Sequence, residues 1–496
     1  MKKIYIYFCL VVFMVCAPFL VKAGNDFTTV DAVTFRLYQE HKWDSLIVVG
    51  KRALKDDIDY YFLRMRLGVA FYSKKRYIPA AENFRKAIFF NSQEQVAWKY
   101  LYSSYVLANR SNDAIALLKR MPVEIRQAYK EDIKFIEMIS FEGGPTFSSD
   151  SKAQNNLDIK SQPGPYGEQD LYGNSYYGQL GMLMNLSGKI NLSVAYSYMD
   201  FTKLKFYQYS QFDNQLISRA DSFWGFINNY NFSPAIKTAD FTYHVKQQDI
   251  CVVSTILLPD GFRLEPAVHL LYVKYNLITP KYSKTNVMDT LVFDSIFPGN
   301  NYFASVEKEN YSLIEKDTSF LNYVVSLGIS KDFSVFNLRL NGSWSNLNNK
   351  TQKQIGAAFT FYPLGNLDFY GTSAVTGFFQ GNDQRLILSQ SLGGRVLRKL
   401  WLEGNVIYGD LTNANIANGS IVYNNADKID YRIGGTLIWP LSKHIELSLM
   451  YQYFQKESST LYYVFKNPIP DPTTTTETLY SKYHTNSIII GIKWKL

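Results

Sequence analysis

An alternation of apolar and polar residues near the C-terminus constrains the fold more than any other feature of the sequence. Every second position there is apolar or aromatic, whereas small or charged residues lie between them: Ile488, Ile490, Ile492, Trp494 and Leu496 against Gly491, Lys493 and Lys495. A period of two is typical of a β-strand with one apolar face. The pattern recurs in segments 336–345 and 445–453. The sequence therefore predicts strands from about residue 139 to the end of the chain.

Alternation alone does not separate a soluble β-sandwich from a barrel, but the connectors favour a barrel. Short turns are expected at 187–189, 259–261, 331–332, 363–366, 398–399 and 440–443. They alternate with longer connectors at 150–173, 206–237, 282–317, 410–427 and 456–481, and with modest ones at 346–352 and 380–384. Outer-membrane barrels have tight periplasmic turns and long outer loops. We predict an antiparallel transmembrane β-barrel of about 14 strands over residues 136–496.

The composition agrees with a membrane barrel. The chain has 38 Tyr and 34 Phe, yet its mean hydropathy is only −0.16. No uninterrupted apolar run of about 18 residues follows Ala23, so the sequence predicts no transmembrane helix. A barrel escapes that test because only alternate residues of each strand face lipid.

The N-terminus has the pattern of a secretory signal peptide. Lys2 and Lys3 precede an apolar run, and Ala23 supplies a small residue for cleavage, so residues 1–23 are expected to be removed. A retained membrane anchor is the alternative. Cleavage would leave Cys251 as the single cysteine, which excludes an intramolecular disulfide. Nucleic acid is not an expected partner, because the formal charge of +9 is spread thinly and the protein is exported.

Residues 24–135 have helical spacing and an offset of about 34 residues, the period of a helix-turn-helix solenoid. One copy contains Leu67, Gly68, Phe71, Tyr77, Ala80, Phe84 and Ala87. The first six of these are matched by Leu101, Tyr102, Tyr105, Ser111, Ala114 and Leu118. A degenerate earlier copy contains Trp43, Leu46, Gly50 and Ala53. Small residues at such positions let paired helices approach closely.

These residues resemble the tetratricopeptide (TPR) repeat, with Ser92 standing where that family usually has Pro. The resemblance covers about a fifth of the chain and implies a concave surface that binds an extended peptide or a partner protein. Its residues would be Met65, Val69, Tyr72, Lys99, Ser103 and Val106. The alternative is that the repeats only cap the barrel or pack on themselves.

Charged residues on the expected inward faces lie mostly beside the short turns. They are Glu142, Arg263, Glu265, Arg339, Asp368, Arg395, Glu403, Glu446, Lys493 and Lys495. A charge that faces lipid at mid-depth costs about 2–4 kcal/mol, so these side chains are expected in the lumen at the periplasmic mouth. Their mixed sign favours a lattice of ion pairs over the single-sign ring of an ion-selective pore.

The sequence offers no signature of catalysis. His269 is expected to face inward and His484 to lie at a loop edge, and neither has a nucleophile motif around it. The five histidines show no metal-ligand spacing, and no phosphate loop is present. We therefore expect no metal, no cofactor and no enzymatic activity.

The joined architecture resembles bacterial proteins that place TPR repeats before an outer-membrane barrel, including the YaiO-type family, and the Tyr, Phe and Asn content resembles proteins of Bacteroidetes. The resemblance implies an α+β multidomain protein of the Gram-negative outer membrane with its N-terminal domain in the periplasm. The leading hypothesis is a non-enzymatic scaffold whose periplasmic TPR domain binds a protein in envelope assembly, secretion or a surface complex. The alternatives are a channel or substrate-specific transporter, and a lipid- or glycan-modifying enzyme. The expected partners are outer-membrane lipid, a periplasmic or membrane protein, and the barrel assembly machinery, which recognises C-terminal strands like this one.

Overall fold

The computed structural model describes residues 26–108, 110–127, 129, 134–150, 166–187, 189–212, 215–222, 225–231, 234–293, 301–333, 335–465 and 474–496. The chain divides into two compact units, Met1–Lys130 and Glu131–Leu496. The predicted signal peptide, 1–23, lies outside the described residues. Within the described residues, no helix combines the length and the apolar character needed to cross a bilayer.

The first unit is built from helices. In its described residues these are α2 (Phe27–Gln39), α3 (Trp43–Lys55), α4 (Tyr61–Ser73), α5 (Tyr77–Phe90), α6 (Gln95–Leu107), α7 (Ser111–Leu118) and α8 (Val123–Arg126). Leu63, Leu67 and Phe84 are fully buried between them. A Cβ added to Gly68 would lie 2.5 Å from the Phe84 ring, so the close approach of α4 and α5 requires glycine there. The predicted helical unit is confirmed, and the TPR kinship stays a resemblance.

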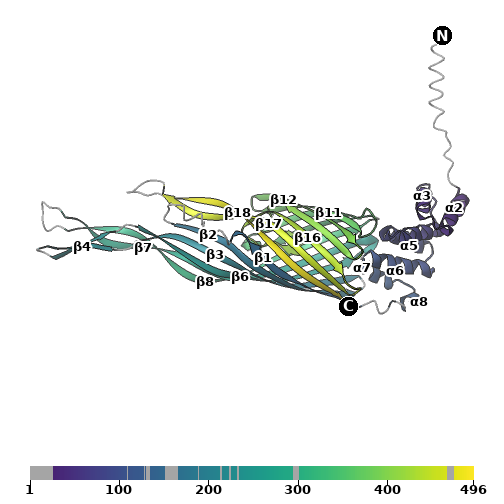
Figure 1. The fold of residues 1–496 in the computed structure, drawn as a ribbon, viewed down its shortest axis with the longest axis horizontal. Coiled ribbons are helices and arrows are strands. Elements are labelled where there is room, and N and C mark those ends of the chain that lie inside the picture. Colours follow the sequence, from purple (N-terminus) through teal and green to yellow (C-terminus); the bar gives the residue numbers. More distant parts are fainter. Residues whose placement is uncertain are drawn as a thin grey trace, which may run out of the picture. The chain divides into compact units, whose positions relative to one another are not determined.

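The second unit is a closed antiparallel barrel of 14 strands, as predicted (Figure 1). In spatial order from β1 the wall contains β1 (Ile136–Ser148), β18 (Thr474–Lys495), β17 (Ile445–Phe465), β16 (Lys428–Pro440), β13 (Leu400–Tyr408), β12 (Asp383–Leu397), β11 (Phe369–Gln380), β10 (Gln352–Phe361), β9 (Phe336–Ser345), β8 (Asn301–Asp332), β7 (Phe262–Phe293), β6 (Pro234–Leu257), β3 (Ile190–Phe212) and β2 (Tyr166–Ser187). Two small two-stranded sheets are separate from this wall: β4 (Gln215–Ser222) with β5 (Gly225–Asn231), and β14 (Asn415–Ile416) with β15 (Ile421–Val422).

An apolar band covers the barrel exterior, and β8 shows its outer edge. Leu321, Val325 and Leu327 are 45–58% exposed, whereas Ser326 between them is 5% exposed and faces the lumen. Beyond Leu321, the next three outward positions of β8 are polar: Ser319, Asp317 and Glu315. Large apolar side chains outside and small polar ones inside are the organisation of a transmembrane barrel.

Aromatic residues mark both edges of this apolar band. Trp439 and Trp494 are exposed beside the short-turn end, and Tyr408 and Tyr451 are exposed towards the other end. Trp401, also near the short-turn end, is not one of them, because its indole Nε1 donates a hydrogen bond to the carbonyl of Leu367 at 3.0 Å. Its alternation places it on the inner face, opposite exposed Leu402.

Most of the long connectors are strand rather than loop, which corrects the expectation for 206–237, 282–317 and 456–481. β7 pairs with β8 as far as Phe293 and Asn301, and β17 pairs with β18 as far as Phe465 and Thr474. These two-stranded ribbons extend well past the short wall of β11 and β12 (Figure 1). Alternation did not reveal them because both faces of a ribbon in water can be polar. The turn expected at 331–332 lies further along the chain, because β8 ends at Asp332 and β9 begins at Phe336.

Candidate functional site

Segment 409–427, which joins β13 to β16, folds into the barrel lumen. At its deepest point the Ser326 hydroxyl donates to the Asn418 carbonyl at 2.6 Å. The Asn418 amide donates to the backbone carbonyl of Glu265 at 2.7 Å, and His269 Nδ1 contacts the Gly419 carbonyl at 3.1 Å. The wall residues belong to the inner faces of β7 and β8. This corrects the prediction that 410–427 is an outer loop.

The middle of the segment is held by one side chain of β10. Gln354 Nε2 donates to the Asn415 carbonyl at 2.7 Å, and Gln354 Oε1 accepts from the Asn415 backbone amide at 2.8 Å. The Asn415 side chain also donates to Ser343 Oγ at 3.1 Å. Asn415 is 2% exposed and Gln354 is 5% exposed. The wall thus satisfies backbone groups that a loop removed from water must pair.

Apolar residues of the segment complete its fit to the opposite wall. Leu411 and Ala414 are fully buried, and Tyr423 is 8% exposed. They pack with the inward side chains Phe378, Ile387, Ile407 and Ile429. Burying such side chains contributes about 25 cal/mol per Å² of apolar surface. The segment therefore behaves as a small core inside the barrel.

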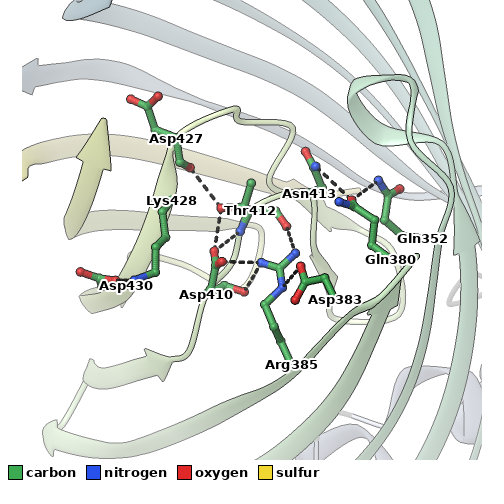
Figure 2. A network of polar contacts seen from close by, with 10 residues as sticks. All are labelled: Gln352, Gln380, Asp383, Arg385, Asp410, Thr412, Asn413, Asp427, Lys428 and Asp430. Atoms are coloured by element: carbon green, nitrogen blue, oxygen red, sulfur yellow. Dashed lines mark hydrogen bonds and ion pairs between the residues drawn. The ribbon is translucent and has the colours of Figure 1, made fainter. Parts of the chain in front are cut away.

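Arg385 of β12 anchors the start of the segment at the outer rim (Figure 2). Its guanidinium pairs with Asp410 at 2.7 Å and with Asp383 at 2.9 Å. It also donates to the carbonyls of Asp410 at 3.1 Å and Thr412 at 3.2 Å. Thr412 Oγ1 in turn lies 3.3 Å from the carbonyl of Asp427, so the two ends of the segment are tied together.

Tight turns let the segment reverse inside the lumen. Asn413, Ala417, Asn418 and Gly419 all have positive φ angles. A side chain at Gly419 would meet the Ser326 hydroxyl at 2.8 Å. Glycine at this position therefore permits both the left-handed backbone and the close approach to β8.

The structure pairs eight of the ten predicted mouth residues with groups of opposite charge, and the other two with tyrosine hydroxyls. Arg339 Nε lies 3.0 Å from Glu265, Arg395 lies 2.6 Å from Asp368, and Lys493 and Lys495 lie 3.1 and 3.7 Å from Glu446. Arg263 is in contact with Asp332. Glu403 accepts a hydrogen bond from the Tyr370 hydroxyl at 2.8 Å, and Glu142 accepts one from Tyr177 at 2.9 Å. Opposite signs therefore alternate around the short-turn end.

The six residues expected on the concave helical face divide into two groups. Met65, Val69 and Tyr72 are partly buried against the helical core. The Tyr72 ring also contacts the rings of Tyr77 and Tyr100 at centroid distances of 5.5 and 5.1 Å. Lys99 and Val106 are exposed, and Ser103 is half-buried.

The two histidines weighed for catalysis have structural neighbours. His269 lies under Gly419, and its Nε2 is 3.9 Å from Asp249. His484 stacks on Tyr453 at a centroid distance of 5.6 Å. Within the described ranges no group of three or more His, Cys, Asp or Glu side chains could hold a metal ion.

The sequence interpretation missed the inward segment and its partners Gln354, Ser326 and Arg385. A signal was present, because 409–427 contains five Asn together with Leu411, Ile416, Ile421 and Val422. A solvated outer loop has no need for so many apolar residues. Asn residues among them suit tight turns and hydrogen bonding to the wall.

No protein-family model matches the chain, and no curated protein matches it. Among solved structures it is similar to the P. putida toluene transporter TodX, with 8% identity over 78% of this chain and 94% of that one and a TM-score of 0.38. It is also similar to a Pseudomonas aeruginosa FadL homologue, with 6% identity over 72% and 90% and a TM-score of 0.38. A MamA AMB-1 structure has 22% identity over 23% of this chain and 60% of that one, with a TM-score of 0.19. Similarities with such low identities and TM-scores do not indicate the function of this chain.

Proposed function

We propose that the protein is a substrate-specific outer-membrane channel whose lumen is closed at rest by segment 409–427. The observation that carries this proposal is the hydrogen bonding of the segment to the inner faces of β7, β8 and β10 through Gly419, Asn418 and Asn415. A barrel that served only as an anchor would not need a polar inner wall matched to an inserted segment. We therefore favour the channel, which was the alternative in the sequence analysis, over the scaffold, which was its leading hypothesis.

The chemistry of the contacts suits a segment that can be displaced. Asn415 and Asn418 are held by hydrogen bonds between uncharged groups. Each such bond contributes only about 0.5–1.5 kcal/mol net, because water replaces it when it breaks. The stronger pairs of Arg385 lie at the rim, where they tether the segment without fixing its tip. Displacement of the tip would open the lumen while the tether remains.

The ion pairs at the mouth define the aperture without selecting one sign of charge. Arg339 pairs with Glu265 and Arg395 with Asp368, so neither sign dominates the ring. Pores that select one ion type use rings of a single sign. Selection by shape and hydrogen bonding in the lumen is therefore the better fit.

Conductance in planar bilayers tests the proposal. Purified wild-type protein is expected to give no large stable current, whereas a variant with residues 411–425 replaced by a short Gly-Ser turn gives clear conductance steps. Heat-dependent gel migration checks that both barrels are folded. If neither folded protein conducts, the result would favour the scaffold. A large current from the wild type would show that the segment does not block the lumen.

The helical unit supports a second candidate function, binding of a periplasmic protein. We place it in the periplasm because the chain enters β1 from the end that carries the short turns, which face the periplasm in such barrels. Phe89 and Phe90 of α5, with ring centroids 5.9 Å apart, are 81% and 44% exposed. Exposed apolar residues that cluster can mark an interface. A pull-down with Lys99→Glu plus Val106→Ser tests it, since both residues are exposed. Tyr72→Ala would instead disturb packing, because Tyr72 contacts Tyr77 and Tyr100.

A further inference from the structure

The barrel wall divides at one point on its outer side. β6 and β7 are paired only as far as Val245 and Tyr275, although both strands continue. Beyond this rung β6 remains paired with β3, and β7 remains paired with β8, so the wall separates into two ribbons (Figure 1). The Tyr207 hydroxyl of β3 still donates a hydrogen bond to the Ile278 carbonyl of β7 at 2.5 Å. A cleft of about 420 Å³ lies at the point of divergence.

The cleft has an aromatic inner part and a cationic outer part. Tyr243 and Tyr275 line it from inward positions, and Lys246 and Lys274 line it from outward positions. The strand alternation fixes these directions, because Ile250 on β6 and Tyr272 on β7 are 47% and 42% exposed on the outer face. On that same face Lys274 follows Tyr272 directly, and Lys246 follows Ile250 after the exposed Gln248.

Lys246 and Lys274 are direct cross-strand partners in the last rungs of the β6–β7 pairing. Both are exposed, and neither forms an ion pair with a residue that the structure describes. Like charges placed directly opposite each other destabilise a sheet. An anion between the two ammonium groups would remove this repulsion.

The other basic groups of the cleft are already engaged. Lys205 lies 3.1 Å from Glu168 and 3.2 Å from Asp170. His244 Nδ1 lies 2.8 Å from Asp200. Asp200, which holds His244, is also the cross-strand partner of Lys246 on β3, and Glu315 lines the cleft and accepts a hydrogen bond from Asn276. Lys246 and Lys274 are thus the basic groups of the cleft that form no ion pair among the described residues.

We propose that this cleft binds the phosphate-bearing headgroup of an outer-leaflet membrane lipid. Lys246 and Lys274 contact the phosphate, and the rings of Tyr243 and Tyr275 pack against the rest of the headgroup. The height of the lysines supports a lipid rather than a soluble anion. Tyr272 is the next outward residue below Lys274, Ile250 lies two outward positions below Lys246, and both belong to the face that meets acyl chains. Basic pockets at the membrane surface recognise anionic headgroups by the same electrostatics. The proposal does not depend on whether the lumen conducts.

A lipid-binding measurement on the full-length protein in neutral detergent tests the proposal. The probes are a fluorescent diphosphorylated glycolipid, the same lipid without phosphates, and inorganic phosphate as a competitor. Wild type is expected to prefer the phosphorylated lipid, and Lys246→Gln plus Lys274→Gln to weaken its binding about tenfold at low salt. The matched control is Lys350→Gln plus Lys353→Gln, which removes the same charge from exposed positions around β10 and is expected to bind like wild type.

Each other result overturns the proposal. Equal binding by wild type and the Lys246 and Lys274 variant would remove the lysines from the site, and an equal loss in the control pair would show only nonspecific charge attraction. Competition by millimolar inorganic phosphate that matches competition by unlabelled lipid would exclude a lipid as the occupant. The Lys246→Gln plus Lys274→Gln variant is expected to fold, because removal of a like-charged pair should leave its thermal stability unchanged or raised.

Discussion

The side-chain amide of Gln354 pairs with the backbone of Asn415 as a neighbouring strand would, donating to its carbonyl at 2.7 Å and accepting from its amide at 2.8 Å. A third hydrogen bond, from Asn415 Nδ2 to Gln354 Oε1, measures 2.8 Å. A single wall side chain thus satisfies both backbone groups of a lumenal residue. This contact holds the middle of the inserted segment to β10.

Gln354→Leu is expected to raise the frequency of channel openings about tenfold, because a buried backbone group left without a partner costs about 1–3 kcal/mol in the closed state. Single-channel recording gives the measurement. Gln384→Leu is the control, since Gln384 is exposed near the outer end of β12. Unchanged opening of the Gln354 variant would mean that this contact does not hold the segment closed.

Arg385→Lys is expected to weaken the attachment of segment 409–427 to β12 at the outer rim. Lysine keeps the charge but lacks the planar fork that lets Arg385 reach two carboxylates and two carbonyls at once. Limited proteolysis within 411–425 should become about tenfold faster, as for loss of about 1.4 kcal/mol of local stability. Arg398→Lys, at an exposed position of a short turn, should leave the rate unchanged. Equal rates in all three proteins would contradict the tethering role of Arg385.

The helical unit should lose stability in acid through Asp31. Burial would raise the pKa of this carboxyl, but hydrogen bonds from Tyr60 and Arg66 outweigh burial and hold it below its ordinary value of 3.8. The stabilisation is therefore fully present above pH 3.8 and is lost as the pH falls through the lowered pKa. Hydrogen exchange of α2 amides in the full chain should rise over that range. In Asp31→Asn this dependence should largely disappear, and an identical profile in the variant would contradict the assignment.

Gly68→Ala should destabilise the helical unit. Overpacking against the fully buried Phe84 ring costs about 1–3 kcal/mol, and the better helix propensity of Ala returns about 1 kcal/mol. Thermal unfolding followed by the helical circular dichroism signal measures the net loss. Ser73→Ala, exposed at the end of α4, should be nearly neutral. Phe84→Leu should reduce the cost of Gly68→Ala, and strict additivity of the two changes would exclude a steric cause.

The barrel was predictable because lipid imposes a rule on every strand. Outward residues such as Leu327 must be apolar while Ser326 beside it need not be, and this difference repeats along the wall. Short turns such as 398–399 follow from the same constraint, since backbone inside a bilayer must stay paired. The strand count and the short-turn end could therefore be inferred from alternation and spacing.

The inserted segment and the divided wall could not be predicted in this way. Asn415 and Asn418 are as polar as residues of a solvated loop, and only their partners in the lumen distinguish them. The separation of β6 from β7 beyond Tyr275 depends on strand register, which local sequence does not specify where both faces are polar. Lys246 and Lys274 become neighbours only through that register.

Closure of the lumen by segment 409–427 is tested most directly by a reversible cross-link. A Cβ added to Gly328 would lie 3.2 Å from the Asn418 side chain, so Gly328→Cys plus Asn418→Cys, made in a Cys251→Ser background, should form a disulfide between β8 and the segment. Combined with Gln354→Leu, the oxidised protein is predicted to remain closed in planar bilayers and to regain openings when reductant is added. Failure of the cysteines to cross-link, or equal opening before and after reduction of a complete cross-link, would contradict the account.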